Sequence, residues 1–203
     1  MRQSITDRRS EMQGPQRGRP SLSSAGMLAA ADALFAASDT PGTVTMEAIA
    51  AAASVGKGTL FRAFGSRDGL LDALWAAKIA ALRERVESGV PPFERDTAPQ
   101  DRLVAFLDAI LTFKLENRHL IRAREFSTGL LQSPHYRWMH AVVRALLDAA
   151  AGRSPANDST YAAHALLAAL HIDFIEEMLA GGLSLSAIRQ AQASHARAVV
   201  DRR

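Results

Sequence analysis

Cationic and hydroxyl side chains gather in one short segment that also carries two glycines. The segment reads Gly56-Lys57-Gly58-Thr59-Leu60-Phe61-Arg62-Ala63-Phe64. Lys57 and Arg62 can contact phosphates or a guanine edge, and Thr59 can contact a phosphate or a thymine methyl group. Gly56 and Gly58 keep the start of the segment slim, so its backbone N–H groups can come close to an anion. These residue types at this spacing indicate contact with nucleic acid.

Further cationic and polar residues flank this segment. Thr45 offers a hydroxyl, and Arg67 lies where a following helix is predicted to begin. The eleven residues from Lys57 to Arg67 contain no acid, and such a basic stripe is typical of a nucleic-acid binder. A solvated basic surface is the alternative. Arg17 and Arg19 lie in a polar N-terminal segment and can enter a minor groove, as N-terminal arms do elsewhere.

Histidines in the C-terminal half suggest a different chemistry. His164 and His171 are seven residues apart on one face of a predicted helix, and His135 and His140 lie on another. A spacing of seven separates two side chains by roughly 10 Å along a helix, too far for one metal ion. The sequence has no HExxH pair, glycine-rich phosphate loop or GxSxG elbow. We therefore expect no catalytic residue, metal site or cofactor.

Apolar periodicity predicts helices along the whole chain after residue 20. They are expected at about 22–37, from Thr45, at 56–64, at 67–87, around 103–113, at 120–126, from Pro134, at 158–179, and from Ser184 or Ser186 to about 200. The sequence shows no strand-like alternation and no internal repeat. The predicted fold class is all-α.

The first three predicted helices have clear boundary signals. Thr45 is expected to be the N-cap of the second helix, and Gly56 that of the third. The second and third form a helix-turn-helix over about 45–64, in which Ser54 is expected to adopt a left-handed conformation. Gly65 is expected to end the third helix, and Ser66 to cap the fourth.

Composition limits the class of protein. The chain has 203 residues, 48% of them hydrophobic and 22% charged, with a formal net charge of +3. It has no cysteine, which excludes disulfides and thiolate sites and fits a reducing compartment. No apolar run approaches 18 residues, and the N-terminus lacks the apolar region of a secretory signal. We expect a cytoplasmic protein without membrane contact.

Residues 24–75 resemble the DNA-binding domain of the TetR (tetracycline-repressor) family. The motifs that carry the resemblance are Thr45-Met46-Glu47-Ala48-Ile49-Ala50, the segment 55–64, and Ser66-Arg67-Asp68-Gly69-Leu70-Leu71. Three positions depart from the family pattern. Phe61 replaces a common Tyr, Ala63 replaces a common His, and the turn reads Ser54-Val55-Gly56 where Gly-Val-Ser is usual.

The resemblance implies what the C-terminal helices do. TetR-like proteins form homodimers through their last two long helices, here about 158–180 and 184–200, although a monomer with a buried central helix is the alternative. They enclose a small-molecule pocket among the preceding helices. The candidate pocket residues are Phe106, Ile110, Phe113, His119, Phe126, Tyr136, Met139, Val143, His164, His171 and Phe174, because aromatic and apolar linings with few polar groups are typical of such sites.

The expected organisation has three parts: a flexible basic arm at 1–20, a DNA-binding domain at 21–71, and an effector-binding and dimerisation domain at 72–203. We expect a homodimeric repressor that reads a near-palindromic operator and releases it on binding a small apolar or amphipathic ligand. A TetR-like ligand-binding or interaction dimer with weakened DNA binding is the alternative. A small all-α hydrolase or metal enzyme using the C-terminal histidines is a third.

Overall fold

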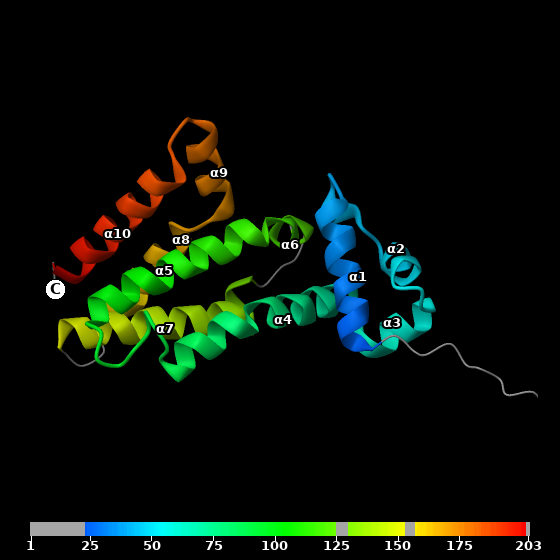
Figure 1. Ribbon diagram of the computed structural model, residues 1–203, viewed down its shortest axis with the longest axis horizontal. Coiled ribbons are helices and arrows are strands. Elements are labelled where there is room, and N and C mark those ends of the chain that lie inside the picture. The colour runs from blue at the N-terminus through cyan, green and yellow to red at the C-terminus, as the bar shows by residue number, and fades with distance from the viewer. Residues whose placement is uncertain (1–22, 125–129, 153–156, 202–203) are drawn as a thin grey trace, which may run out of the picture.

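The computed structural model describes residues 23–124, 130–152 and 157–201. Within these ranges the chain forms ten α-helices and two short 3-10 helices, and no strand (Figure 1). The all-α prediction is confirmed. None of the described helices is long and apolar enough to cross a membrane.

The N-terminal unit consists of α1 (Ser24–Ala37), α2 (Met46–Ala52) and α3 (Lys57–Phe64), with a 3-10 turn, η1 (Pro41–Thr43), after α1. Phe35, Ile49 and Leu60, one from each helix, are fully buried. The Thr45 hydroxyl accepts a hydrogen bond from the Ala48 N–H at 3.2 Å, as expected of an N-cap. Ser54 has φ 52° in the turn between α2 and α3, which confirms the predicted left-handed conformation.

The long helix α4 (Arg67–Ser88) connects this unit to the remaining helices (Figure 1). Its N-cap Ser66 accepts from the Gly69 N–H at 3.0 Å. A Cβ on Gly69 would lie 2.1 Å from the Phe64 carbonyl oxygen, so only glycine lets α4 begin this close to the end of α3. The α4 residues Leu70 and Ile79 are both buried, the first near the N-terminal unit and the second farther along the helix.

Six helices form the C-terminal part: α5 (Pro99–Glu116), α6 (Arg118–Ala123), α7 (Pro134–Ala151), α8 (Asn157–Ala168), α9 (Ile172–Ala180) and α10 (Leu185–Asp201). A short 3-10 turn, η2 (Leu130–Gln132), precedes α7. Helix α5 packs against both α7 and α10, and α7 also packs against α8. The core side chains Phe106, Leu107, Ile110 and Leu111 of α5 are completely or almost completely buried.

The predicted continuous helix at 158–179 is wrong. Helix α8 ends at Ala168 and α9 begins at Ile172, with His171 in an extended conformation between them. Leu170 is fully buried in this break, and its carbonyl oxygen accepts a hydrogen bond from Lys114 Nζ at 2.9 Å. The break is stabilised by the burial of Leu170 and by the hydrogen bond that its carbonyl oxygen accepts. His164 and His171 therefore do not share a helical face.

Candidate nucleic-acid interface

Helix α3 presents most of its length to solvent. Leu60 is 0% exposed and holds the helix to α2, and Phe64 packs half-buried on the same core. The exposed residues are Lys57, Gly58, Thr59, Phe61, Arg62 and Ala63. The structure thus brings the predicted contact residues of this helix together on one surface. Thr45 is also exposed, while Arg17 and Arg19 lie outside the described residues.

Lys57 is held by its neighbours in this structure. Its Nζ forms an ion pair with the Glu47 carboxylate of α2 and lies 5.6 Å from the centre of the Phe61 ring. The hydrogen bond from Lys57 lowers the pKa of Glu47 below its usual value. Both side chains of the pair are more than half exposed, so the pair adds little stability and a phosphate can replace Glu47.

The glycines of α3 differ in what surrounds them. A Cβ on Gly56 would lie 3.9 Å from Thr59 Oγ1, and a Cβ on Gly58 would meet no atom within 4 Å. Packing within the described chain therefore does not require glycine at 58.

The Arg67 guanidinium is already engaged by contacts within the chain. Its guanidinium donates to the carbonyl oxygens of Val44 at 2.9 Å, Ala123 at 2.9 Å, Pro41 at 2.9 Å and Gly42 at 3.1 Å. Partial burial lowers its pKa. The side chain joins η1, α4 and the end of α6, and we leave it out of the proposed DNA contacts. The physical reason is that backbone carbonyls within the chain already use its donors.

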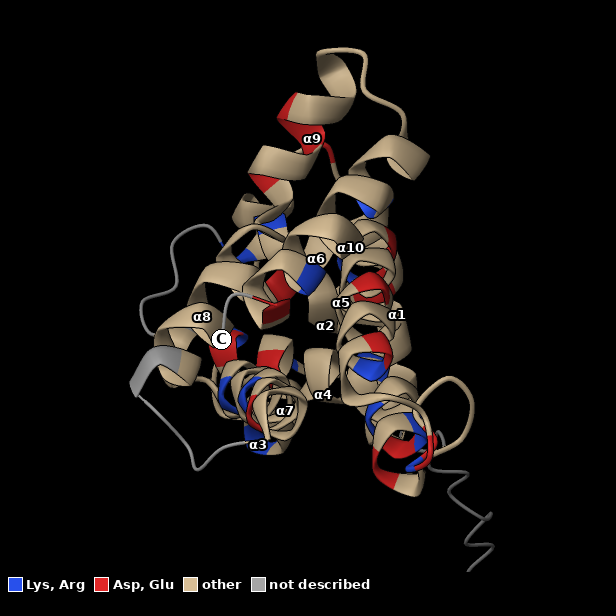
Figure 2. Cartoon of the chain, turned by 90° about the vertical axis from the view of Figure 1, so that its left-hand side faces the viewer, with Lys and Arg blue, Asp and Glu red and all other residues tan. Residues whose placement is uncertain are grey.

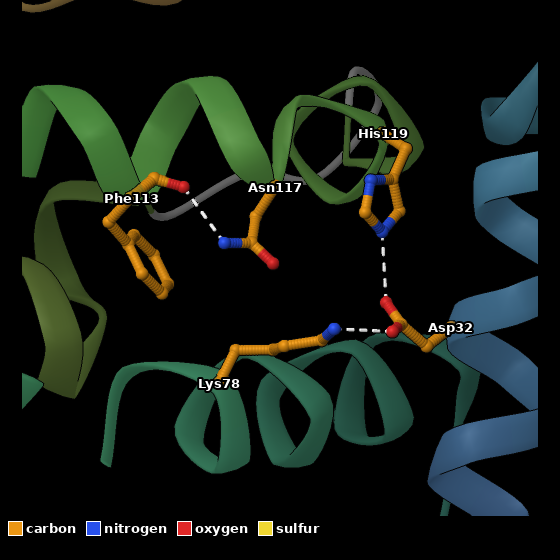
Figure 3. A network of polar contacts seen from close by, with 5 residues as sticks. All are labelled: Asp32, Lys78, Phe113, Asn117 and His119. Atoms are coloured by element: carbon orange, nitrogen blue, oxygen red, sulfur yellow. Dashed lines mark hydrogen bonds and ion pairs between the residues drawn. The ribbon is translucent and has the colours of Figure 1, made fainter. Parts of the chain in front are cut away.

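Helix α6 connects the N-terminal unit to the C-terminal helices through further polar contacts. His119 Nε2 lies 2.9 Å from Asp32 Oδ1 of α1, and Lys78 of α4 pairs with the same carboxylate (Figure 3). Burial acts to raise the pKa of Asp32, but the hydrogen bonds from Lys78 and His119 outweigh it and lower that pKa. Arg124 forms an ion pair with Asp72 of α4. His119, predicted to line a pocket, instead contacts the N-terminal unit.

The other predicted pocket residues lie in separate places. Phe106, Ile110, Phe113, Met139 and Val143 are buried in the core. Tyr136 Oη, near the start of α7, lies 2.6 Å from His164 Nδ1 of α8, and the His140 and His164 ring centres are 4.1 Å apart. His171 and Phe174 are exposed at the start of α9, and Phe126 lies outside the described residues. A single pocket lined by this set stays a prediction.

Figure 2 shows acidic residues along α9, which lies apart from α3; they are Asp173, Glu176 and Glu177. Glu176 accepts from Arg122 of α6 at 2.7 Å. In the part of the chain that the structure describes, no group of three or more His, Cys, Asp or Glu side chains could hold a metal ion.

Comparisons with known proteins agree with this geometry. The family model for bacterial regulatory proteins of the tetR family matches residues 27–74. A solved TetR transcriptional regulator from Rhodococcus sp. RHA1 aligns with a TM-score of 0.59 at 22% identity, over 86% of this chain and 93% of its own. A TetR-like regulator from the same organism gives 0.57 at 24% identity, over 85% and 92%. Comparison with curated protein sequences gives no match.

At these identities the two solved structures show a common fold alone. The family model covers the segment that contains the helix-turn-helix. The segment from α1 into α4 matches the tetR family model, and the chain shares the fold of the two solved regulators over most of its length.

Proposed function

We propose that this protein is a homodimeric repressor that binds a near-palindromic operator and releases it when a small apolar or amphipathic ligand binds. The observation that carries the proposal is the exposed surface of α3. Lys57, Thr59 and Arg62 lie on this surface, and only Leu60 among its residues is fully buried. A short helix presented in this way suits the DNA major groove.

Each exposed residue of α3 has a role in the proposed complex. Lys57 and Arg62 contact phosphates or a guanine edge, and Thr59 contacts a phosphate or a thymine methyl group. Gly56 and Gly58 let the helix N-terminus approach the backbone. Phe61 offers its ring but no hydroxyl. Arg17 and Arg19 reach the adjacent minor groove and compensate for the contacts that Phe61 and Ala63 do not make.

An exposed face of small residues on two C-terminal helices supports the homodimer. On α8, Ala165 and Ala168 are exposed beside Tyr161, which is 76% exposed. On α10, Ala187, Ala191 and Ala198 are exposed at helical spacing. Small side chains let helices pack closely, and a large exposed tyrosine beside them is typical of an interface. We propose that these faces of α8 and α10 pair with a second copy.

Helix α6 is the proposed route from ligand to DNA. It contacts α1 through His119, its Ala123 carbonyl accepts from Arg67 of α4, and it follows α5 directly in the chain. A ligand that shifts α6 changes the spacing of the two recognition helices in the dimer. DNA and ligand then weaken each other's binding by reciprocal coupling.

A salt titration on duplex DNA tests the DNA-binding part. The duplex is one selected from a random-sequence library by the wild-type protein, and affinity is measured by fluorescence anisotropy. The logarithm of affinity should fall linearly with log salt, with a slope of about −0.9 per phosphate neutralised. Lys57→Ala plus Arg62→Ala should lower affinity and make the slope shallower by about 2.

The matched control removes two charges elsewhere. Arg137→Ala plus Arg144→Ala changes two exposed arginines of α7, and it should leave the slope close to that of the wild type. Unchanged affinity in the Lys57 and Arg62 variant would sink the proposal.

The alternative is a ligand-binding or interaction dimer with weakened DNA binding. Two observations favour it: Phe61 lacks a hydroxyl, and Lys57 is paired with Glu47. Failure of the wild-type protein to enrich any duplex would support this alternative. The family consists of bacterial regulatory proteins, which speaks against an enzyme that uses the C-terminal histidines.

A further inference from the structure

A pocket of about 340 Å³ lies between α5 and α10. Its walls include Val104, Leu107 and Asp108 from α5, and Arg189, Gln192 and Ala193 from α10. None of the residues predicted to line a ligand pocket is among them. The volume is at the lower end of the range for small-molecule sites, which is about 300–1,000 Å³.

Gln192 is the unusual residue of this pocket. Both polar atoms of its amide, Nε2 and Oε1, are buried and have no hydrogen-bond partner among the described residues. Leaving one buried polar group unpaired costs about 1–3 kcal/mol. Both atoms belong to a residue that lines the pocket, so a turn of the Gln192 side chain toward the pocket would let a bound molecule supply the missing partners.

Arg189 provides a further free donor beside this amide. Its Nη1 donates to Asp108 Oδ2 at 3.3 Å and its Nη2 to Thr112 Oγ1 at 2.8 Å. Its Nε is buried and has no partner in the described part of the chain. The Asp108 carboxylate offsets the guanidinium charge. The pocket therefore offers an N–H donor and an amide that both donates and accepts, without a strong net charge.

We propose that this pocket binds a neutral small molecule that carries a carboxamide or lactam group on an apolar body. The ligand amide donates to Gln192 Oε1 and accepts from Gln192 Nε2, and its oxygen also accepts from Arg189 Nε. Val104, Leu107 and Ala193 contact the apolar body. This inference deepens the proposed function and rests on it for the ligand's effect on DNA.

Other head groups fit these atoms less well. A carboxylate only accepts hydrogen bonds, so it leaves Gln192 Oε1 unpaired and lies near the like charge of Asp108. An alcohol has one O–H and satisfies one side of the amide at a time. The amide is the simplest group that pairs with both atoms of Gln192 whichever way its side chain is turned.

The test uses the full chain without DNA, with hexanamide as the probe and hexanoate and 1-hexanol as comparison probes of equal chain length. Binding is followed by ¹H–¹⁵N NMR on ¹⁵N-labelled protein. Hexanamide should shift the Gln192 side-chain NH₂ signal and the backbone signals around Leu107 and Ala193 in a saturable way. Hexanoate and hexanol should bind about tenfold more weakly, or not at all.

Variants separate recognition from simple filling of space. Gln192→Met keeps the length of the side chain without its amide and should weaken hexanamide binding about tenfold. Gln132→Met makes the same change at an exposed position of η2 and should leave binding unchanged. Ala193→Leu keeps the amide but fills the pocket, and should abolish binding.

Three results would overturn the inference: no hexanamide-induced shift at the pocket, equal binding to Gln192→Met, or hexanoate binding as tightly as hexanamide. The first result would indicate that water alone satisfies the Gln192 amide. None of these measurements includes DNA, so they can overturn the ligand inference without bearing on DNA binding. The salt titration tests DNA binding separately.

Discussion

Gly58 has surroundings that do not explain why it is glycine. It lies exposed in α3, and a Cβ there would meet no atom of the described chain within 4 Å. A helix interior favours alanine over glycine by about 1 kcal/mol. Stability and DNA binding therefore make opposite demands on this position if α3 is the recognition helix.

Gly58→Ala is expected to raise stability and lower DNA affinity. The free energy of unfolding should rise by about 0.5–1 kcal/mol in urea. Affinity for the selected duplex should fall about tenfold, because the new methyl group keeps the helix N-terminus away from the phosphates. Affinity that rises together with stability would show that this surface does not face DNA.

The ion pair between Glu47 and Lys57 is the second residue-level feature to test. In Glu47→Gln, Lys57 loses its carboxylate partner and the surface next to DNA loses a negative charge, so duplex affinity should rise about threefold to tenfold at low salt. Glu177→Gln makes the same change on exposed α9, far from the recognition helix. An equal increase in both variants would mean that only net charge matters.

Residue types that are close in sequence predicted the backbone conformation around α3 well. They did not predict the contacts of side chains whose partners are far away in the sequence. The positive φ of Ser54 and the cap at Gly65 follow from residues that are neighbours in sequence. Arg67, by contrast, contacts carbonyl groups up to 56 residues away. Nothing in the spacing of the basic residues distinguishes an arginine that contacts phosphate from one that joins helices.

The break between α8 and α9 shows the same limit for helices. The sequence there has no proline or glycine, and its apolar pattern continues without interruption. The break is stabilised by buried Leu170 and by Lys114, which reaches the Leu170 carbonyl oxygen from α5. These are tertiary contacts, and helix propensity is a weak predictor where tertiary packing opposes it.

Lys114 gives the break a measurable pH dependence. Burial lowers the pKa of Lys114 from 10.5 to about 8. Between these two values the unfolded chain holds a proton that the folded chain has released, so folding becomes more favourable as pH rises. Relative to Lys114→Met, wild type should gain about 2 kcal/mol of unfolding free energy between pH 7 and pH 10. Chemical denaturation at several pH values measures this, and parallel curves for the two proteins would contradict it.

The proposed DNA-binding surface and the proposed dimer interface lie in separate parts of the chain. Helix α3, with its exposed surface, lies at one end of the molecule. Helices α8 and α10, with their exposed faces, lie among the C-terminal helices away from that end (Figure 1). Helix α6 lies between them and contacts α1 through His119 and Asp32 (Figure 3). A repressor needs this separation, because the two copies must pair at one end and place two recognition helices on DNA at the other.

The proposed dimer predicts how the full chain sediments and how it binds DNA. Wild type should sediment at twice the chain mass and bind the selected duplex with two chains per site. Ala191→Glu on α10 and Ala165→Glu on α8 place charges in the proposed interface, which should favour the monomer and lower operator affinity, because each half-site must then be bound independently. The same substitution at exposed Ala76 of α4 should leave sedimentation unchanged. If Ala191→Glu and Ala165→Glu remain dimeric while Ala76→Glu dissociates, the copies pair through α4 instead, and the assignment of α8 and α10 to the interface is wrong.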